Sequence, residues 1–236
     1  MPGGLIMCGR FVGYRGKEEL LDLFPIDQCE VAVSASYNIA PSQKILAIVR
    51  QDGQNHLRHF HWGLVPFWAK DTSIGARMIN ARAETVQSKP SFRTAFKKRR
   101  CLIISDGFYE WQGEKGNKQP YFLTLADEQP FVFAGLWESW DDRGKQEPAY
   151  RSCTIITTAA SEAMRPIHHR MPVILKPEAY DPWLDPNFQD AEALKQIITD
   201  QIVTDLVNRP VSKQVNRVAN DAATNIRPLE QMELKL

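Results

Sequence analysis

Short apolar segments of strand length, broken by turn residues, recur along this chain and restrict the folds that it can adopt. Their alternating or buried-type patterns predict strands over 44–50, 56–62, 101–105, 108–112, 121–125, 131–137, 152–158, 173–175 and 211–215. Asp52-Gly53 is a hairpin signal between the first two of these strands. Strands outnumber helices and have hairpin-like spacing, which predicts one α+β domain around a mostly antiparallel, barrel-like β-sheet core.

A smaller number of segments have helical patterns and predict peripheral helices. They cover 16–24, 91–98 with Ser91 near the cap, 161–164, 178–184 and 190–199. Prolines interrupt the stretches 36–42 and 62–70, which are predicted to be loops. No repeat, low-complexity linker or shift in composition divides the chain, so we expect residues 8–236 to form a single domain. Residues 1–7 are expected to be a tail that is absent from, or removed in, the active form.

Composition limits the classes of function. The formal net charge of +1 gives no global attraction to nucleic acid, so any such binding must come from a local patch. The 4 cysteines are scattered without a CxxC pair, which argues against a zinc knuckle or thioredoxin site and favours a reduced, cytoplasmic setting. No run of about 18 apolar residues predicts a membrane span, and residues 1–6 lack the features of a secretion signal.

Cys8, in the stretch Met7-Cys8-Gly9-Arg10-Phe11, is the candidate nucleophile. As a first residue it would carry a free α-amine, with a reference pKa of about 7.7–8.0 against about 10.4 for lysine. A neutral amine attacks an aldehyde to form a Schiff base, and the neighbouring thiol can then close a thiazolidine ring. This chemistry requires that residues 1–7 be absent or removed. The alternative is a small buried cysteine that opens a strand.

Two further residues are candidates for proton transfer. Glu110 lies in an alternating strand, and if it points inward, burial raises its pKa into the range of a general acid or base. The alternative is a solvated or structural glutamate. His168 sits between Pro166 and Pro172, which restrict the loop, and a histidine there can shuttle a proton near neutral pH. The alternative is a loop-stabilising or surface histidine.

Other residues suit an anionic or aromatic ligand. Asn80 and Arg82 share a face if extended and could clamp a substrate oxygen and a phosphate; the alternative is a turn asparagine and a surface ion pair. Arg170, next to the His168-His169 pair, suits phosphate. Phe67 and Trp68 could stack on a nucleic-acid base, and the alternative is that they are core aromatics.

Three other sites are weaker. His56, His59 and His61 have no acidic or cysteine partner nearby in the sequence, so no metal or other cofactor is predicted. No serine lies in a G-x-S-x-G motif, which disfavours that hydrolase class. The basic run 97–100 is interpreted as a solvated charge run.

Six blocks along the chain, in the same order, carry a resemblance to a known family. They are Met7-Cys8-Gly9-Arg10-Phe11, Tyr37-Asn38-Ile39-Ala40-Pro41, Trp62-Gly63-Leu64-Val65-Pro66, Asn80-Ala81-Arg82-Ala83-Glu84-Thr85, Gly107-Phe108-Tyr109-Glu110-Trp111 and His168-His169-Arg170-Met171-Pro172. From residue 7 to about 220 the chain resembles the SOS response-associated peptidase (SRAP) family of abasic-site shielding proteins.

The resemblance implies a DNA-damage protein that binds single-stranded DNA at an abasic site. We expect the protein to be a monomer in the cytoplasm that associates with the nucleoid when it is bound to DNA. It implies that Cys8 forms the thiazolidine cross-link, that Asn80 holds the sugar, and that Glu110 shuttles protons. It further implies that His168 assists Schiff-base chemistry and strand cleavage by β-elimination. The residues implied to contact DNA are Arg10, Asn38, Pro41, Trp68, Arg82 and Arg170.

Two departures from the family pattern bear on these expectations. Seven residues precede Cys8, where the family usually has only the initiator methionine. His169 stands where family members usually carry aspartate, so a different pH dependence is expected. Two other functions stay open: a cysteine-dependent peptidase that acts on its own N-terminus or on another protein, and a non-covalent single-stranded DNA binder.

Overall fold

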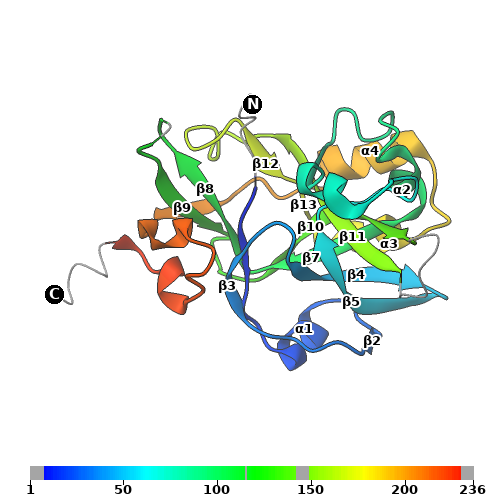
Figure 1. The fold of residues 1–236 in the computed structure, drawn as a ribbon, viewed down its shortest axis with the longest axis horizontal. Helices are drawn as coiled ribbons and strands as arrows, with labels where there is room; N and C mark the ends of the chain where they lie inside the picture. Colours follow the sequence, from blue (N-terminus) through cyan, green and yellow to red (C-terminus); the bar gives the residue numbers. More distant parts are fainter. Residues whose placement is uncertain (1–7, 115, 142–148, 230–236) are drawn as a thin grey trace.

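Two β-sheets form the body of the protein (Figure 1). The computed structural model describes residues 8–114, 116–141 and 149–229. Within these residues the smaller sheet has the order β14-β9-β8-β1-β3. Its strands are β1 (Phe11–Gly13), β3 (Ser36–Ile39), β8 (Gly107–Gln112), β9 (Gln119–Thr124) and β14 (Val207–Pro210).

The larger sheet closes most of the way into a ring. Its order is β12-β11-β10-β7-β4-β5-β2, with β13 on β10 and β6 on β11. Its strands are β2 (Gln28–Cys29), β4 (Lys44–Gln51), β5 (Gln54–Trp62), β6 (Asn80–Arg82), β7 (Arg100–Ser105), β10 (Phe131–Trp140), β11 (Tyr150–Ala159), β12 (Arg170–Pro172) and β13 (Ile174–Leu175). A parallel pairing of β11 with β5, with Ser152 opposite His61, joins the two ends of the series β5-β4-β7-β10-β11. The predicted α+β domain with a mostly antiparallel, barrel-like sheet is therefore confirmed.

Both faces of β7, and of most of β10 and β11, are buried, which explains their nearly continuous apolar sequences, whereas β5 alternates between buried and half-buried positions. In β7, Cys101 and Ile103 pack in a cluster with Phe11 and Trp62, whereas Leu102 and Ile104 pack in a second cluster under the helices. Alternation along the strand separates these two faces. The first cluster also contains Cys8, so the candidate nucleophile adjoins one face of the ring.

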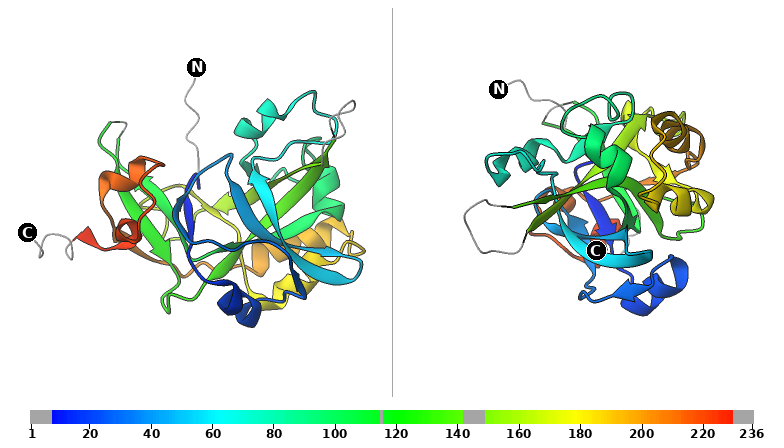
Figure 2. Two further views of the ribbon diagram at one scale, coloured as in Figure 1. Left: turned by 60° about the horizontal axis from the view of Figure 1, so that its bottom comes forward. Right: turned by 90° about the vertical axis from the view of Figure 1, so that its right-hand side faces the viewer.

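The helices lie at the periphery, as predicted. They are α1 (Lys17–Leu23), α2 (Arg93–Lys98), α3 (Tyr180–Leu184) and α4 (Ala191–Asp200), with 3-10 turns η1 (Thr72–Arg77), η2 (Pro177–Ala179), η3 (Lys213–Asn216) and η4 (Ala223–Ile226). Figure 2 shows α3 and α4 beside the ring, and the orange-to-red C-terminal turns against the green β8–β9 hairpin. Asp190 caps α4 by accepting hydrogen bonds from the amides of Glu192 and Ala193.

One predicted loop was wrong. The segment 36–42 contains β3, because Ile39 pairs with Phe11 of β1 and the turn begins only at Pro41. Ser91 lies near the cap of α2 as predicted, directly before the N-cap residue Phe92, which makes no side-chain capping hydrogen bond.

Two predicted elements were also wrong. The segment 161–164 forms turns instead of a helix, since Pro166 has no N–H to continue a helical ladder. The strand predicted over 211–215 lies earlier, as β14, and Val211 makes only an isolated bridge. After it Ser212 accepts a hydrogen bond from the Gln214 amide and starts η3. In the described part of the chain, no helix combines the length and apolarity needed to cross a membrane.

Candidate active site

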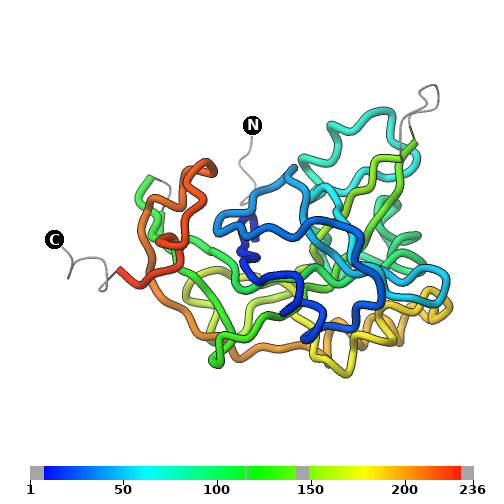
Figure 3. The backbone as a smooth tube through the Cα atoms, turned by 90° about the horizontal axis from the view of Figure 1, so that it is seen from below, coloured from blue at the N-terminus to red at the C-terminus, as the bar shows by residue number. Residues whose placement is uncertain are grey.

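Cys8 and Glu110, which are 102 residues apart in the sequence, meet through strand pairing. β1 pairs with β8 on one side and with β3 on the other, so the start of the described chain lies beside Glu110. The backbone nitrogen of Cys8 donates a hydrogen bond to Oε1 of Glu110 at 2.6 Å. Figure 3 shows the dark-blue N-terminal strand between the green-to-orange β8, β9 and C-terminal segments and the rest of the molecule. The contact joins the candidate nucleophile to the candidate proton shuttle.

The electrostatics of this pair favour nitrogen chemistry. Glu110 is 3% exposed, and burial raises its pKa to about 7 despite the opposing hydrogen bonds from the amides of Cys8 and Trp111. Burial, and then the charge of Glu110, raise the pKa of the Cys8 thiol well above its usual value. The thiol is therefore protonated at neutral pH, while Glu110 can accept or release a proton there. The interpretation of Glu110 as a solvated glutamate is wrong.

Cys8 also has a strained backbone. Its φ of 40° lies in the left-handed region, which costs a non-glycine residue about 1–2 kcal/mol. The side chain is buried at 1% exposure among apolar neighbours. Such outliers persist where surrounding contacts fix them, and here the hydrogen bond to Glu110 does so.

His168 presents a free ring nitrogen in a buried position. Its Nδ1 lies 3.1 Å from the Arg170 amide nitrogen and 3.3 Å from the Arg170 carbonyl oxygen, so it accepts from the amide in one tautomer and donates to the carbonyl in the other. Nε2 is buried and has no hydrogen-bond partner among the described residues. Burial, and then the neighbouring charge of His169, lower the pKa of His168. The ring stacks on His169, with a distance of 4.4 Å between ring centroids. His168 is therefore not a surface histidine.

Arg170 is held in a bidentate ion pair. Its Nη1 and Nη2 donate to the two carboxylate oxygens of Glu84 at 2.7 and 3.0 Å, and Nη2 also donates to the carbonyl of Thr157 at 2.6 Å. The hydrogen bonds from Arg170 lower the pKa of Glu84. The pair joins β12 to the segment that follows β6.

Asn80 and Arg82 lie on β6, which pairs in parallel with β11. Asn80 stands opposite Ile155 and Arg82 opposite Thr157, so the predicted extended conformation and shared face are confirmed. Arg82 is exposed, and Asn80 is half-buried.

Arg10 and Asn38 are bound to the C-terminal segment. Arg10 Nη1 donates to Asn38 Oδ1 at 2.8 Å and to the Val215 carbonyl at 2.9 Å. The amide of Asn38, a residue that is 1% exposed, donates to the carbonyls of Val215, Arg217 and Asn220. The described C-terminal segment thus packs beside the site through its backbone carbonyls. Contacts of this kind leave no motif in the sequence, because every residue has a carbonyl.

The loop before β6 carries exposed aromatic rings. Phe67 is 53% exposed and Trp68 is 49% exposed, so their interpretation as core aromatics is wrong. Pro41, in the turn between β3 and β4, is half-buried.

One hydrogen bond and one nearby charge link the Glu110 strand to the His168 loop. Gln112 Nε2 donates to the Pro166 carbonyl at 2.9 Å. Lys118 lies close enough to both groups for its charge to lower the pKa of Glu110 and of His168, each as a smaller contribution than burial. Lys118 was not singled out in the sequence, because it lies in a turn without a motif.

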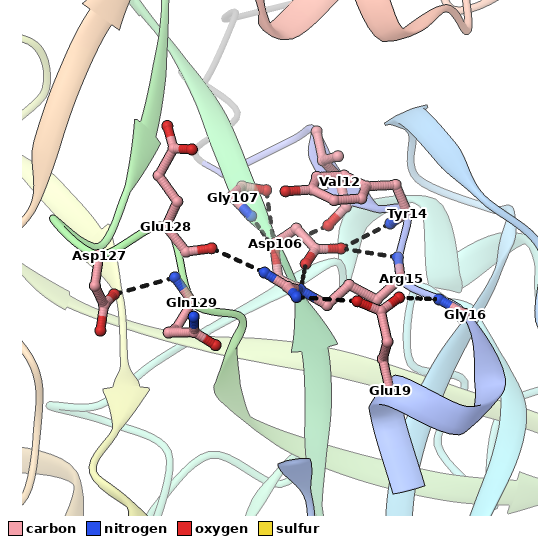
Figure 4. Close-up of polar contacts among 11 residues, drawn as sticks. Val12, Tyr14, Arg15, Gly16, Glu19, Asp106, Gly107, Asp127, Glu128 and Gln129 are labelled. Carbon is pink, nitrogen blue, oxygen red and sulfur yellow. Dashed lines mark hydrogen bonds and ion pairs between the residues drawn. The ribbon is translucent and has the colours of Figure 1, made fainter. Parts of the chain in front are cut away.

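Some charged residues are structural. Arg100, in the basic run predicted to be solvated, is buried and donates to the carbonyls of Trp183, Phe96, Lys97, Asp185 and Phe188. Asp106 is also buried, and accepts hydrogen bonds from the amides of Tyr14 and Arg15 and from Arg15 Nε, as Figure 4 shows. No group of three or more histidine, cysteine or acidic side chains that could hold a metal ion occurs among the described residues.

Gly107, next to Asp106, shows why the start of β8 needs glycine. Its φ is +158°, and a Cβ would lie 2.3 Å from the ring of Phe122. The close approach lets β8 pass between β1 and β9 and so positions Glu110.

The structure combines a near-closed ring of strands with a second, smaller sheet. The site lies where the backbone nitrogen of Cys8 donates to the buried Glu110, so the fold and site define a class of protein whose candidate chemistry is at this cysteine. The family model described as SOS response associated peptidase (SRAP) matches residues 7–218. The chain belongs to the SRAP family.

Curated relatives extend along nearly the whole chain. The protein is 42% identical over 220 residues to "Abasic site processing protein YoaM" of Bacillus subtilis, covering 92% of this chain and 96% of that one. It is 31% identical over 229 residues to "Abasic site processing protein YedK" of Escherichia coli, covering 94% and 100%. A crystal structure of a Bacteroides thetaiotaomicron protein has a TM-score of 0.81 at 26% identity, covering 94% of this chain and 99% of that one.

Proposed function

We propose that this protein processes abasic sites in single-stranded DNA by forming a covalent thiazolidine with Cys8. The proposal requires Cys8 to be the first residue, so that its nitrogen becomes an α-amine. That nitrogen already lies 2.6 Å from Glu110 Oε1, and this single observation carries the proposal. The names of the curated relatives support the same substrate.

The first step is attack of the neutral amine on the ring-opened sugar aldehyde. The C–N bond forms, the nitrogen loses its protons, and the aldehyde oxygen leaves as water to give a Schiff base. Glu110, with a pKa of about 7, takes a proton from the nitrogen and returns one to the departing oxygen.

The second step closes the ring. The Cys8 sulfur adds to the imine carbon, and the thiol proton passes to the nitrogen, so no oxidant or cofactor is required. The raised pKa of the thiol keeps it protonated until the Schiff base has formed, which supports an order in which the amine reacts first.

His168 is proposed to assist the competing cleavage of the strand. In β-elimination from the Schiff base, a base removes a proton from the sugar and the 3′ phosphate leaves. The lowered pKa of His168 keeps its ring neutral at pH 7. In the tautomer whose Nδ1–H donates to the Arg170 carbonyl at 3.3 Å, the buried Nε2 has a free lone pair that can accept this proton. Asn80 would hold the sugar by a hydrogen bond.

The DNA strand is proposed to cross Trp68 and Pro41 and to pass the exposed Arg82. Stacking and phosphate contacts of this kind bind single strands without sequence preference. Arg10, Asn38 and Arg170 already bind protein groups, so we propose that they contribute to DNA binding chiefly by shaping the surface.

Replacement of Cys8 by serine tests the proposal. Cys8→Ser is expected to abolish the heat-stable adduct with an abasic single-stranded oligonucleotide and to retain weak DNA binding, because serine cannot form a thiazolidine. Denaturing electrophoresis and intact mass measure the adduct. The matched control is Cys29→Ser, a half-buried cysteine outside the site, which should cross-link like the wild type. A persistent adduct in Cys8→Ser would contradict the proposal.

A second candidate activity, cleavage of the chain before Cys8, is favoured by the same hydrogen bond. Glu110 Oε1 accepts from the nitrogen that would leave when the peptide bond preceding Cys8 breaks. The thiol would attack the preceding carbonyl, Glu110 would protonate the nitrogen, and water would hydrolyse the thioester. Intact mass of the purified wild type and of Glu110→Gln tests this: only the wild type should begin at Cys8.

A further inference from the structure

The loop that carries Phe67 and Trp68 is fixed at every second residue. The Val65 amide donates to Ser152 Oγ at 2.8 Å, and the Phe67 amide donates to Glu138 Oε2 at 3.2 Å. The Ala69 carbonyl accepts a hydrogen bond from Trp140 Nε1 at 2.8 Å. The backbone around two half-exposed rings is therefore held at three points.

All three anchors come from one end of the β10–β11 hairpin. Glu138 and Ser152 are direct cross-strand partners, and Trp140 pairs with Tyr150. Glu138 and Trp140 are two residues apart on β10, so they lie on one face of the strand. The hairpin end thus acts as a rigid support for the loop.

Among the three residues that anchor the loop, Glu138 is the one whose burial costs the most free energy, because it carries a charge. It is 2% exposed, and its other carboxylate oxygen is paired with Arg99 Nε. A buried ion pair adds little net stability compared with apolar residues of the same volume, because both charges lose hydration. A contribution to fold stability therefore does not account for the presence of a carboxylate at position 138. Its hydrogen bond to the Phe67 amide, which fixes the loop, does account for it.

We propose that Glu138 is a positioning residue for single-stranded DNA, which holds Phe67 and Trp68 as a pre-ordered stacking platform for unpaired bases. This inference rests on the proposed function, because it assumes that the loop binds DNA. Pre-ordering lowers the conformational entropy lost on binding, so the residue acts on affinity and takes no part in the chemistry at Cys8.

The test measures binding of a fluorescent single-stranded oligonucleotide without an abasic site, so that Cys8 chemistry is not involved. Glu138→Ala is expected to weaken binding by about 5- to 150-fold, the range that corresponds to loss of one stacked base. In a Phe67→Ala/Trp68→Ala background the same substitution should add less than about 2-fold, because both rings that it positions are already gone.

A second readout separates positioning from loss of fold. With abasic DNA, Glu138→Ala should raise the half-saturating DNA concentration and leave the maximal cross-linking rate unchanged, whereas partial unfolding lowers the maximal rate. The matched control is Asp106→Ala, which removes another buried carboxylate paired with an arginine (Figure 4). It should lower stability without changing affinity. Trp140→Phe, which removes only the indole N–H, should weaken binding by about 2- to 5-fold if Glu138→Ala does not fold.

Each outcome decides the inference. Unchanged affinity in both Glu138→Ala and Trp140→Phe overturns the inference and leaves the proposed function intact. Equal weakening by Glu138→Ala with and without the Phe67 and Trp68 rings does the same. Failure of the wild type to bind single-stranded DNA overturns the proposed function, and the inference with it.

Discussion

Glu110 shows how burial changes one residue from a simple acid into a proton shuttle. Removal from water raises its pKa to about 7, and a carboxylate with that pKa exchanges protons at neutral pH. The same burial is costly, since an ionised carboxylate is poorly solvated in an apolar environment. The folded protein therefore tolerates a stability penalty at the position where we propose that the chemistry occurs.

The penalty predicts a pH-dependent difference in stability between wild type and Glu110→Gln. The pKa of Glu110 is ordinarily 4.5 and is about 7 in the folded protein, so the folded state binds more protons between these values. The contribution of Glu110 to the free energy of unfolding of the wild type is highest below pH 4.5, and it falls by about 3 kcal/mol as the pH rises to 7. Glutamine does not titrate and avoids this loss.

Urea unfolding of both proteins between pH 4 and 8 measures the difference. Relative to the wild type, Glu110→Gln should become more stable by about 3 kcal/mol across this range. Comparing the two proteins at each pH cancels other titrating groups, including Asp106 and Glu138, whose pKa values burial also raises. A constant difference across the range would show that Glu110 is not a titrating buried group.

At the scale of elements, the C-terminal segment 213–221 completes the site that β1, β3 and β8 begin. Arg10 and Asn38 bind its carbonyls, and Trp111 Nε1 donates to Asn216 Oδ1 at 2.8 Å. These polar contacts replace strand pairing, because the segment forms a 3-10 turn with few ladder bonds of its own.

This arrangement predicts that Asn38→Ala releases the C-terminal segment. Loss of the buried amide leaves three carbonyls with weaker partners, at a cost of about 1–3 kcal/mol. Hydrogen exchange of residues 213–221 should become at least about 5-fold faster. Asn187→Ala, an exposed asparagine between α3 and α4, should change nothing. Unaltered exchange in Asn38→Ala would mean that other contacts hold the segment.

For the whole molecule, the near-closed ring depends on a tight interior as well as on strand pairing. Gly135 of β10 stands opposite Cys101 and Ile155. A Cβ at this position would lie 2.7 Å from the Cys101 sulfur and 2.8 Å from Ile103 Cδ1. Glycine is needed here for space, since no unusual φ is involved.

Gly135→Ala is therefore expected to destabilise the protein by about 1–3 kcal/mol through overpacking of the ring. Thermal or urea unfolding measures the loss. Gly16→Ala is the matched control, because its Cβ would meet no atom closer than 3.7 Å, and it should cost less than about 1 kcal/mol. An equal effect of the two substitutions would indicate that the ring interior can relax.

The sequence by itself determined most of the strands, the barrel-like sheet and the order of the family motifs. Strand patterns such as those of β4, β5 and β7 are local, because alternation or continuous apolar character follows directly from burial. The resemblance in six blocks also led to Cys8, Glu110 and His168 before any contact was known. The candidate nucleophile and the candidate proton-transfer residues could therefore be predicted from the sequence, because their roles depend on residue type and on the motif in which they stand.

Only the tertiary structure decided which faces are buried and which groups meet. Period-two alternation could not tell whether Glu110 points inward, and nothing local to Phe67 or Trp68 showed that both are exposed. β3 was missed because its strand partner, β1, lies far away along the chain. Contacts between Cys8 and Glu110, or Glu138 and Phe67, arise from long-range pairing, and a pairing partner 102 residues away leaves no periodic signal in the sequence.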